Sequence, residues 1–211
     1  MRHVFINELI KQSKRDKDIY LITADLGFRA FEAFQKEFPE RFYNLGISEQ
    51  NMITVASGLS INGKNVFAYS MIPFLTMRCF EHIKVDICSM NLPITLIGLG
   101  SGLSYDIDGP SAHGLIDIGL MRLLPTFTIL NPSDPILASQ CAKIAFNNNA
   151  PTYVRLDKSQ QKKIYSPNDD FSLGYKFFDR GRDLCIISSG IMVHQGLEII
   201  EELKDFGLSA S

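Results

Sequence analysis

Residues 66–99 read VFAYSMIPFLTMRCFEHIKVDICSMNLPITLIGL. The run at 66–69 is short and apolar, which predicts a buried strand. Apolar side chains then recur at helical spacing from Phe74 to Ile87, and residues 93–99 form a second apolar run. A strand, a helix and a strand in this order predict a βαβ unit, whose two strands are parallel.

The same alternation extends along the chain in both directions from this unit. Short apolar runs predict further strands at 19–24, 126–130 and 152–156. Helical spacing or helix-start residues predict helices at 3–15, 30–38 and 115–123, one from Ser48 to a C-terminal Gly63, and one that begins near Pro132. We therefore expect an α/β fold: a mainly parallel sheet flanked by helices on both faces. Ligands in such sheets bind beyond the carboxyl ends of the strands.

Composition excludes several classes of protein. Of 211 residues, 45% are hydrophobic and the net charge is −2, so the chain is not disordered as a whole and has no general attraction for nucleic acid. No apolar run approaches the ~20 residues that span a bilayer, so no membrane partner is expected. Four scattered cysteines and four scattered histidines have no metal-ligand spacing. We expect reduced thiols, no metal ligands in this chain, and a cytoplasmic protein.

The chain divides into three parts. Residues 1–156 contain the expected sheet, and residues 157–182 are polar, with Lys162, Lys163 and Pro167, which is typical of a linker. A further strand at 183–188 and a helix at 193–206 follow. A strand, a helix and a short end cannot bury a core of their own. We therefore expect 183–211 to be the start of a truncated second α/β unit of a longer protein.

Glu49 is the first candidate for chemistry, and it has two readings. Ser48 is a candidate N-cap, and a carboxylate in the first turn of a helix is favoured by the helix dipole, so Glu49 could be structural. Phe74, Met77 and Phe80 at helical spacing could likewise be ordinary core residues. The glycine-rich run GLGSGL at 98–103 lacks the third glycine of a dinucleotide-binding loop.

A series of motifs decides between these readings. The runs are FYNLGISEQNM at 42–52, ASGL at 56–59, AYS at 68–70, DGP at 108–110, HG at 113–114, MRLLP at 121–125, NPSD at 131–134 and PTYVR at 151–155. In this order and spacing they resemble the pyrimidine-binding domain of transketolase-type enzymes over residues 1 to about 156. The end of the chain from Asp183 is similar to the opening of that family's C-terminal domain.

The resemblance implies thiamine diphosphate as cofactor and gives Glu49 a task. The cofactor must lose a proton from its thiazolium ring, and its own amino group removes that proton only after proton exchange at N1′ of the pyrimidine. Glu49 matches the carboxylic acid that performs this exchange. Phe74 and Phe80 match aromatic positions that pack the pyrimidine ring, and Met77 is expected to line the same wall.

Another motif of the family is missing. Its members hold the diphosphate and Mg²⁺ through a GDG…NN motif in a separate domain; GDG does not occur here, and Asn147–Asn149 stands without it. The resemblance therefore implies one half of a split transketolase. A partner of the N-terminal type would bind the diphosphate and supply the Mg²⁺ ligands, and self-association through the pyrimidine-binding domain is expected.

The residues expected to contact substrate follow the pattern incompletely. The histidine of the family's DG-x-[ST]-H pattern is replaced by Ala112, and His113 follows it; acid–base and structural roles both stay open for His113. Asp108 matches a residue that contacts a donor hydroxyl, and Arg155 matches one that binds substrate phosphate. Other phosphate-binding positions are not recognisable, so phosphorylation of the donor stays open.

The resemblance implies a subunit of a transferase that moves a two-carbon ketol unit from a ketose to an aldehyde. One alternative is a β-type subunit of a 2-oxo-acid decarboxylating enzyme or a deoxyxylulose-phosphate-synthase-like enzyme, which would use pyruvate-like donors. An alternative of another class is a non-catalytic scaffold or regulatory paralogue, which Ala112 and the short C-terminal part would suit.

Overall fold

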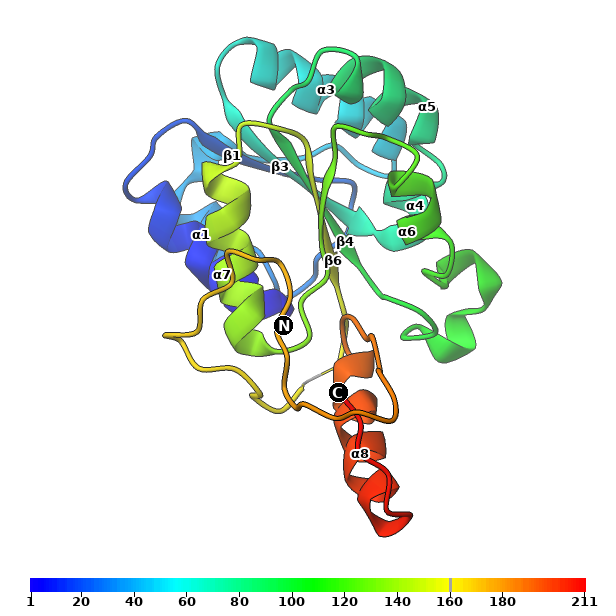
Figure 1. The fold of residues 1–211 in the computed structure, drawn as a ribbon. Helices are drawn as coiled ribbons and strands as arrows, with labels where there is room; N and C mark the ends of the chain where they lie inside the picture. The colour runs from blue at the N-terminus through cyan, green and yellow to red at the C-terminus, as the bar shows by residue number, and fades with distance from the viewer. Residues whose placement is uncertain (160) are drawn as a thin grey trace.

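A computed structural model describes residues 1–159 and 161–211. Its centre is one six-stranded sheet in the order β2-β1-β3-β4-β6-β5 (Figure 1). All neighbouring strands are parallel, which confirms the expected fold class. The strands are β1 (Ile19–Thr23), β2 (Phe42–Asn44), β3 (Asn65–Met71), β4 (Ile94–Leu99), β5 (Thr128–Leu130) and β6 (Thr152–Leu156).

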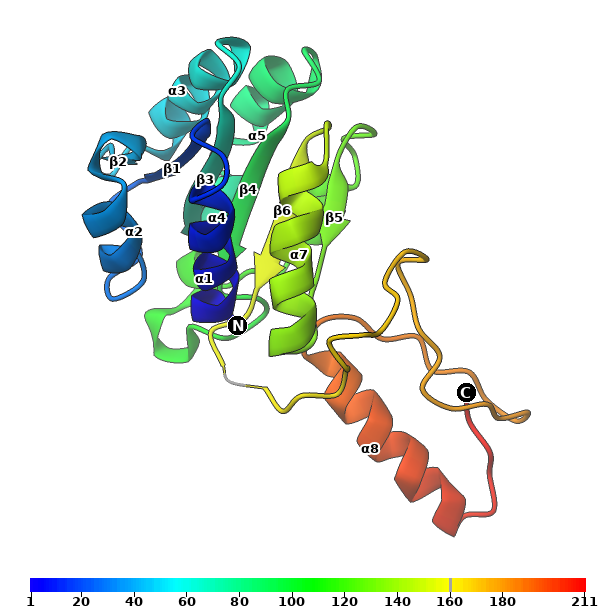
Figure 2. The same ribbon diagram turned by 90° about the vertical axis from the view of Figure 1, so that its left-hand side faces the viewer.

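Helices cover both faces of the sheet (Figures 1 and 2). On one face α1 and α7 pack against each other, with α2 beside them; α3, α4 and α6 pack on the other face. The helices are α1 (Arg2–Ser13), α2 (Glu32–Glu37), α3 (Glu49–Ile61), α4 (Ile72–Thr76), α5 (Phe80–His82), α6 (Asp117–Met121), α7 (Pro135–Asn147) and α8 (Met192–Asp205). Short helical segments of other kinds are η1 (Pro39–Arg41), η2 (Ile83–Cys88), η3 (Asp106–Asp108) and η4 (Pro110–Ala112).

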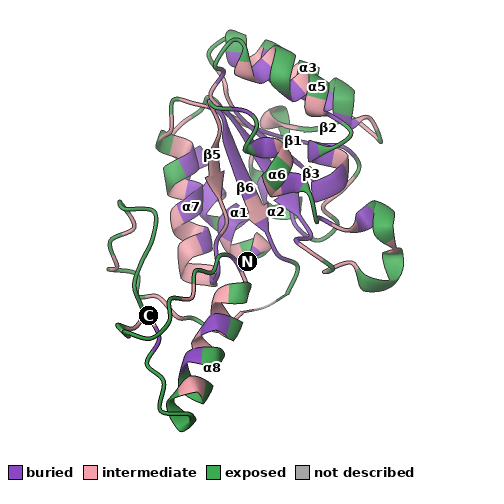
Figure 3. Cartoon of the chain, turned by 45° about the vertical axis from the view of Figure 1, so that its right-hand side comes forward, coloured by how far each residue is buried: buried purple, intermediate pink, exposed green. Residues whose placement is uncertain are grey.

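Burial explains why the central strands could be recognised. Every residue of β4 is buried, and so are the inner residues of β3. The middle of the sheet is accordingly purple in Figure 3. Strands covered by helices on both faces need apolar side chains at successive positions, not at alternate ones. Two large side chains, Tyr69 of β3 and Tyr153 of β6, are completely enclosed on opposite faces of the sheet.

Two local expectations need correction. The helix expected from Phe74 to Ile87 is divided into α4, α5 and the π-helical segment η2. The edge strand β2 was not predicted, because three residues with two exposed side chains give no apolar run. Because the expected helix is broken after α4, residues 72–80 form short helical segments and a turn directly after β3.

The C-terminal part lies outside the main sheet, where α8 projects beyond the end of α7 (Figure 2). The expected helix at 193–206 is confirmed as α8. The expectation of a regular strand at 183–188 was wrong: this segment makes one parallel bridge, between Leu184 and Ala210, and few backbone bonds to residues 209–211. A single bridge supplies too few backbone hydrogen bonds to hold a regular strand. The division of the chain into a domain at 1–156, a linker at 157–182 and a second unit at 183–211 stays a prediction.

Candidate functional site

The predicted site residues gather at the carboxyl edge of the sheet. Glu49 follows β2, Phe74 follows β3, Asp108 and His113 follow β4, and Arg155 lies near the end of β6. Because the strands are parallel, all these positions lie beyond or at the same edge. This is the edge at which open parallel sheets bind ligands.

Glu49 is the first residue of α3, and only 2% of it is exposed. Ser48 stands at the N-cap position, but its hydroxyl donates to the Leu45 carbonyl at 2.8 Å instead of capping the helix. The Ser70 hydroxyl, at the end of β3, lies 3.4 Å from Oε1 of Glu49. Glu49 is thus a carboxylate enclosed by tertiary structure, and the simple capping interpretation does not account for its burial.

Arg78 is a site residue that the sequence reasoning missed. Its Nη1 donates to Oε2 of Glu49 at 2.5 Å, and its Cζ lies over the Phe74 ring, 4.3 Å from the ring centroid. One guanidinium therefore contacts both Glu49 and Phe74, which are both predicted to bind the cofactor. The available signal was the spacing of four between positions 74 and 78, which puts side chains on the same side of a helical segment.

The neighbouring residues of this segment differ in burial. Cys79 is fully buried, and burial, followed by the nearby Glu49 charge, raises the pKa of its thiol to about 12, so it is not a nucleophile. Phe80 is half-buried against the core that contains Met52 and Ile53. Met77 is 51% exposed. The cofactor-binding roles of Met77 and Phe80 stay predictions.

The loop from Gly100 to Ile116 carries Asp108 and His113. Asp108 is exposed, whereas His113 is half-buried with Nε2 3.1 Å from the Asp106 carbonyl oxygen. The loop is anchored on α4, because a Cβ at Gly114 would lie 2.8 Å from Ile72, and η4 contacts α4. Packing therefore holds this loop against the helix that contains Phe74.

Arg155 is engaged inside the protein. Its Nε donates to Oδ2 of Asp117 at 2.8 Å, and its Nη2 donates to the Gly114 carbonyl at 2.9 Å. Asp117 is 1% exposed and also accepts a 2.7 Å hydrogen bond from the Tyr153 hydroxyl. Burial, together with this carboxylate, raises the pKa of Tyr153 well above its usual value. Arg155 thus ties β6 to the loop, and its substrate contact stays a prediction.

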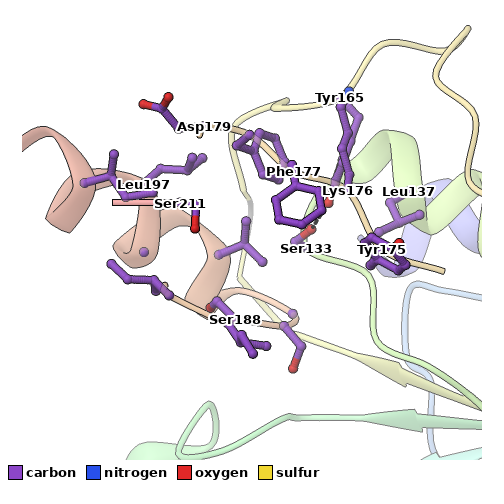
Figure 4. Close-up of a pocket in the computed structure, with 18 of the residues that line it drawn as sticks. Ser133, Leu137, Tyr165, Tyr175, Lys176, Phe177, Asp179, Ser188, Leu197 and Ser211 are labelled. Atoms are coloured by element: carbon purple, nitrogen blue, oxygen red, sulfur yellow. Dashed lines mark hydrogen bonds between the residues drawn. The ribbon is translucent and has the colours of Figure 1, made fainter. Parts of the chain in front are cut away.

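Two cavities open near the carboxyl edge or beyond it, and Glu49 is not among the described residues that line either one. The first, of about 720 Å³, is lined by Ser101, Arg155, Lys158 and residues of the start of α8. The second, of about 390 Å³, lies between α7, α8 and residues 174–179, with Tyr165, Phe177 and Leu197 on its walls (Figure 4). Most of the residues that line it are apolar, and none of the predicted site residues is among them.

Asp157 fixes the wall of the larger cavity. Burial pushes the pKa of Asp157 upward, but hydrogen bonds from Ser101, Ser104 and Ser159 outweigh burial and lower it below its usual value.

In residues 1–159 and 161–211 no helix is long and apolar enough to cross a membrane, and no three His, Cys, Asp or Glu side chains form a metal-binding group.

Comparison with known proteins identifies the family of this chain. Residues 1–163 match the family model described as the transketolase pyrimidine-binding domain. The chain belongs to the transketolase family. It is 34% identical to a putative transketolase C-terminal section of Methanocaldococcus jannaschii, over 100% of this chain and 68% of that protein. It is 31% identical to one of the subunits of an apulose-4-phosphate transketolase of Actinobacillus succinogenes, again over 100% and 68%.

Solved structures show the same relationship. A split-gene transketolase, determined as an inactive β4 tetramer, superposes with a TM-score of 0.88 and 32% identity, over 99% of this chain and 68% of that one. A 1-deoxy-D-xylulose-5-phosphate synthase of Clostridium kluyveri is 31% identical, but this chain covers 33% of it. This transketolase-family chain is therefore a subunit of a thiamine diphosphate-dependent transferase that moves a ketol unit together with a partner subunit.

Proposed function

We propose that this subunit supplies the aminopyrimidine side of the cofactor site, with Glu49 as the residue that exchanges a proton with N1′. The observation that carries the proposal is a 2% exposed carboxylate at the start of α3, with the ring of Phe74 in contact with the same Arg78 guanidinium that pairs with Glu49. These two groups fit an aminopyrimidine, which needs a hydrogen-bonding carboxyl group at N1′ and an apolar face for its ring. Thiamine diphosphate, when bound, supplies the carbon nucleophile that attacks the donor carbonyl.

The remaining roles belong to the chain and to a partner. Glu49 holds and moves the proton at N1′; Phe74, and in this proposal Met77 and Phe80, orient the ring and exclude water. The partner subunit, of the transketolase N-terminal type, holds the diphosphate and provides the ligands of Mg²⁺. The split-gene relative that forms an inactive β4 tetramer supports both self-association and the need for a further component. Free thiols at all four cysteines support a reducing compartment, the cytoplasm.

The substrate side is assigned to the loop after β4. Asp108 contacts a donor hydroxyl, and His113 acts as acid or base near the reacting carbonyl. Arg155 contributes to substrate binding at the end of β6, where it also holds the loop through Gly114. The ketose donor and the aldehyde acceptor then meet at the carboxyl edge of the sheet.

Glu49→Gln tests the proton role. In the complex with the partner, we expect turnover to fall by about 10²-fold or more, because general acid–base groups contribute roughly 10²–10⁴-fold. Glu81→Gln is the matched control, since Glu81 is exposed on the neighbouring α5. Equal turnover of the Glu49→Gln and wild-type complexes would show that the proton-exchange assignment is wrong.

A donor screen separates the alternatives. With ketose donors, turnover supports ketol transfer, whereas turnover with pyruvate-like donors alone would support the 2-oxo-acid or deoxyxylulose-phosphate-synthase-like alternative. A complex that binds the cofactor and turns over neither donor class supports the non-catalytic paralogue.

A further inference from the structure

The Arg78 guanidinium occupies the two groups that the proposed cofactor site requires. Its Nη1 donates a hydrogen bond to Oε2 of Glu49 at 2.5 Å. Its Cζ stands over the face of Phe74 at 4.3 Å from the ring centroid. The second carboxylate oxygen, Oε1, faces the Ser70 hydroxyl at 3.4 Å.

A guanidinium and an aminopyrimidine compete for such a place because their chemistry is alike. Both are planar and stack on an aromatic face, and a guanidinium and an aminopyrimidine protonated at N1′ each present an N–H donor in the plane to a carboxylate. The Phe74 face and the Oε2 atom covered by Arg78 cannot at the same time receive a second flat group. One of the two planar groups has to leave before the other can bind there.

The side chain of Arg78 is free to leave. It is 42% exposed, whereas the side chain of Arg155, which pairs with Asp117, is 13% exposed. A half-exposed arginine regains most of its hydration when it swings into solvent, so the guanidinium itself loses less on leaving than a buried one would. The backbone of Arg78 stays in place, since its carbonyl accepts a hydrogen bond from the Gln50 side chain at 3.3 Å.

We propose that Arg78 is an internal placeholder, which pairs with the buried Glu49 and covers Phe74 until the aminopyrimidine of the cofactor displaces it. This inference rests on the proposed function of Glu49 and Phe74. Without such a placeholder the subunit alone would carry an unpaired buried carboxylate, which is costly. The consequence is a competition. In the wild-type protein the cofactor must first displace Arg78, and the free energy needed to break its contacts lowers the observed affinity for the cofactor and slows its binding.

Cofactor binding to the assembled complex tests the competition. The measurements are calorimetric affinity and stopped-flow association of thiamine diphosphate with Mg²⁺, for wild type, Arg78→Met and Arg78→Lys. Arg122→Met is the matched control, because Arg122 is an exposed arginine in another turn, after α6. We expect Arg78→Met to bind about tenfold more tightly, ~1.4 kcal/mol, and faster. Arg78→Lys keeps the charge without the flat group, so its affinity for the cofactor is expected to lie between those of Arg78→Met and wild type.

Two results would overturn the inference. Unchanged affinity in Arg78→Met would show that no competition exists, and weaker binding would show that Arg78 contacts the bound cofactor. If the wild-type complex binds no cofactor, the proposed function itself fails, and the placeholder role fails with it.

Thermal unfolding of the chain alone gives a readout that does not depend on the cofactor. We expect Arg78→Met to lower the melting temperature less in a Glu49→Gln background than in wild type, because the two side chains are coupled. Equal shifts in both backgrounds would show that the ion pair is absent in solution and would overturn the inference even if the complex binds cofactor.

Discussion

Replacing Asp117 by Ala should destabilise the protein more than any single surface change. Its carboxylate is 1% exposed and accepts hydrogen bonds from the Tyr153 hydroxyl at 2.7 Å and from Nε of Arg155 at 2.8 Å. Alanine removes both acceptor oxygens. The guanidinium of Arg155, whose side chain is 13% exposed, then has no carboxylate partner, and the buried Tyr153 hydroxyl has no acceptor.

The magnitude follows from these two losses. Removal of one partner of a buried ion pair costs about 3–5 kcal/mol, and an unsatisfied buried hydroxyl costs about 1–3 kcal/mol. The two losses share one carboxylate and are not additive, so we expect about 5 kcal/mol in total. For a chain of this size, 1 kcal/mol corresponds to roughly 2–4 °C in melting temperature. Asp117→Ala should therefore melt about 10–20 °C lower than wild type.

Urea unfolding followed by circular dichroism measures the effect in wild type, Asp117→Ala, Arg155→Met and the double variant. If the ion pair dominates, the loss of unfolding free energy in the double variant is smaller than the sum of the two single losses by at least ~1 kcal/mol. The reason is that the double variant leaves no unpaired guanidinium. A loss below ~1 kcal/mol for Asp117→Ala, or strictly additive effects, would refute the reasoning.

Three further predictions address the loop, the acid limit and the thiols. Gly114→Ala should lower the free energy of unfolding in urea by about 1–3 kcal/mol, because its Cβ would lie 2.6 Å from a backbone oxygen. Gly58→Ala, in an exposed turn of α3 with nothing within 4 Å of the added Cβ, should raise it by up to ~1 kcal/mol. Similar changes for the two variants would contradict the close packing at Gly114. Hydrogen bonds lower the pKa of Asp157, so its contribution to stability is present above its unfolded pKa of about 3.9 and is lost as the pH falls through its folded value. Asp157→Asn should therefore flatten the melting-temperature profile below about pH 4; an unchanged profile would count against it. Cys185 is exposed and should react with an aromatic disulfide reagent in the native protein, whereas the Cys79 thiol, whose pKa burial raises to about 12, should react only on unfolding, as labelling followed by mass spectrometry would show.

Strands buried on both faces could be predicted from the sequence, and isolated segments could not. The run from Ile94 to Leu99 is apolar throughout because helices cover both sides of β4, so its composition alone marks it. Residues 183–188 are also largely apolar, yet a strand needs a continuous ladder of backbone hydrogen bonds to a neighbour. Their partner segment, 209–211, provides a single bridge. Local composition reports burial, and it carries no information on the neighbour that completes the ladder.

The candidate site shows the same limit at the level of side chains. The position of Glu49 at the start of a helix could be read from Ser48 and the residues that follow. Its contact with Arg78, which is 29 residues away in the sequence, depends on how α3 packs against the segment after β3. The pair between Asp117 and Arg155 likewise joins a loop helix to a strand. A charged residue near a ligand edge can face the ligand or the protein, and sequence alone does not distinguish the two.

The position of β6 between β4 and β5 affects how the sheet can assemble on the ribosome. β5 pairs with β6 and not with β4, so it has no place in the sheet until Leu156, the last residue of β6, has emerged. At about 5–20 residues per second, the chain between the end of β4 and the start of β6 takes roughly 3–10 s to synthesise. During that time the nascent protein presents the unpaired, apolar edge of β4. A chaperone that binds nascent chains would meet its main target in that interval.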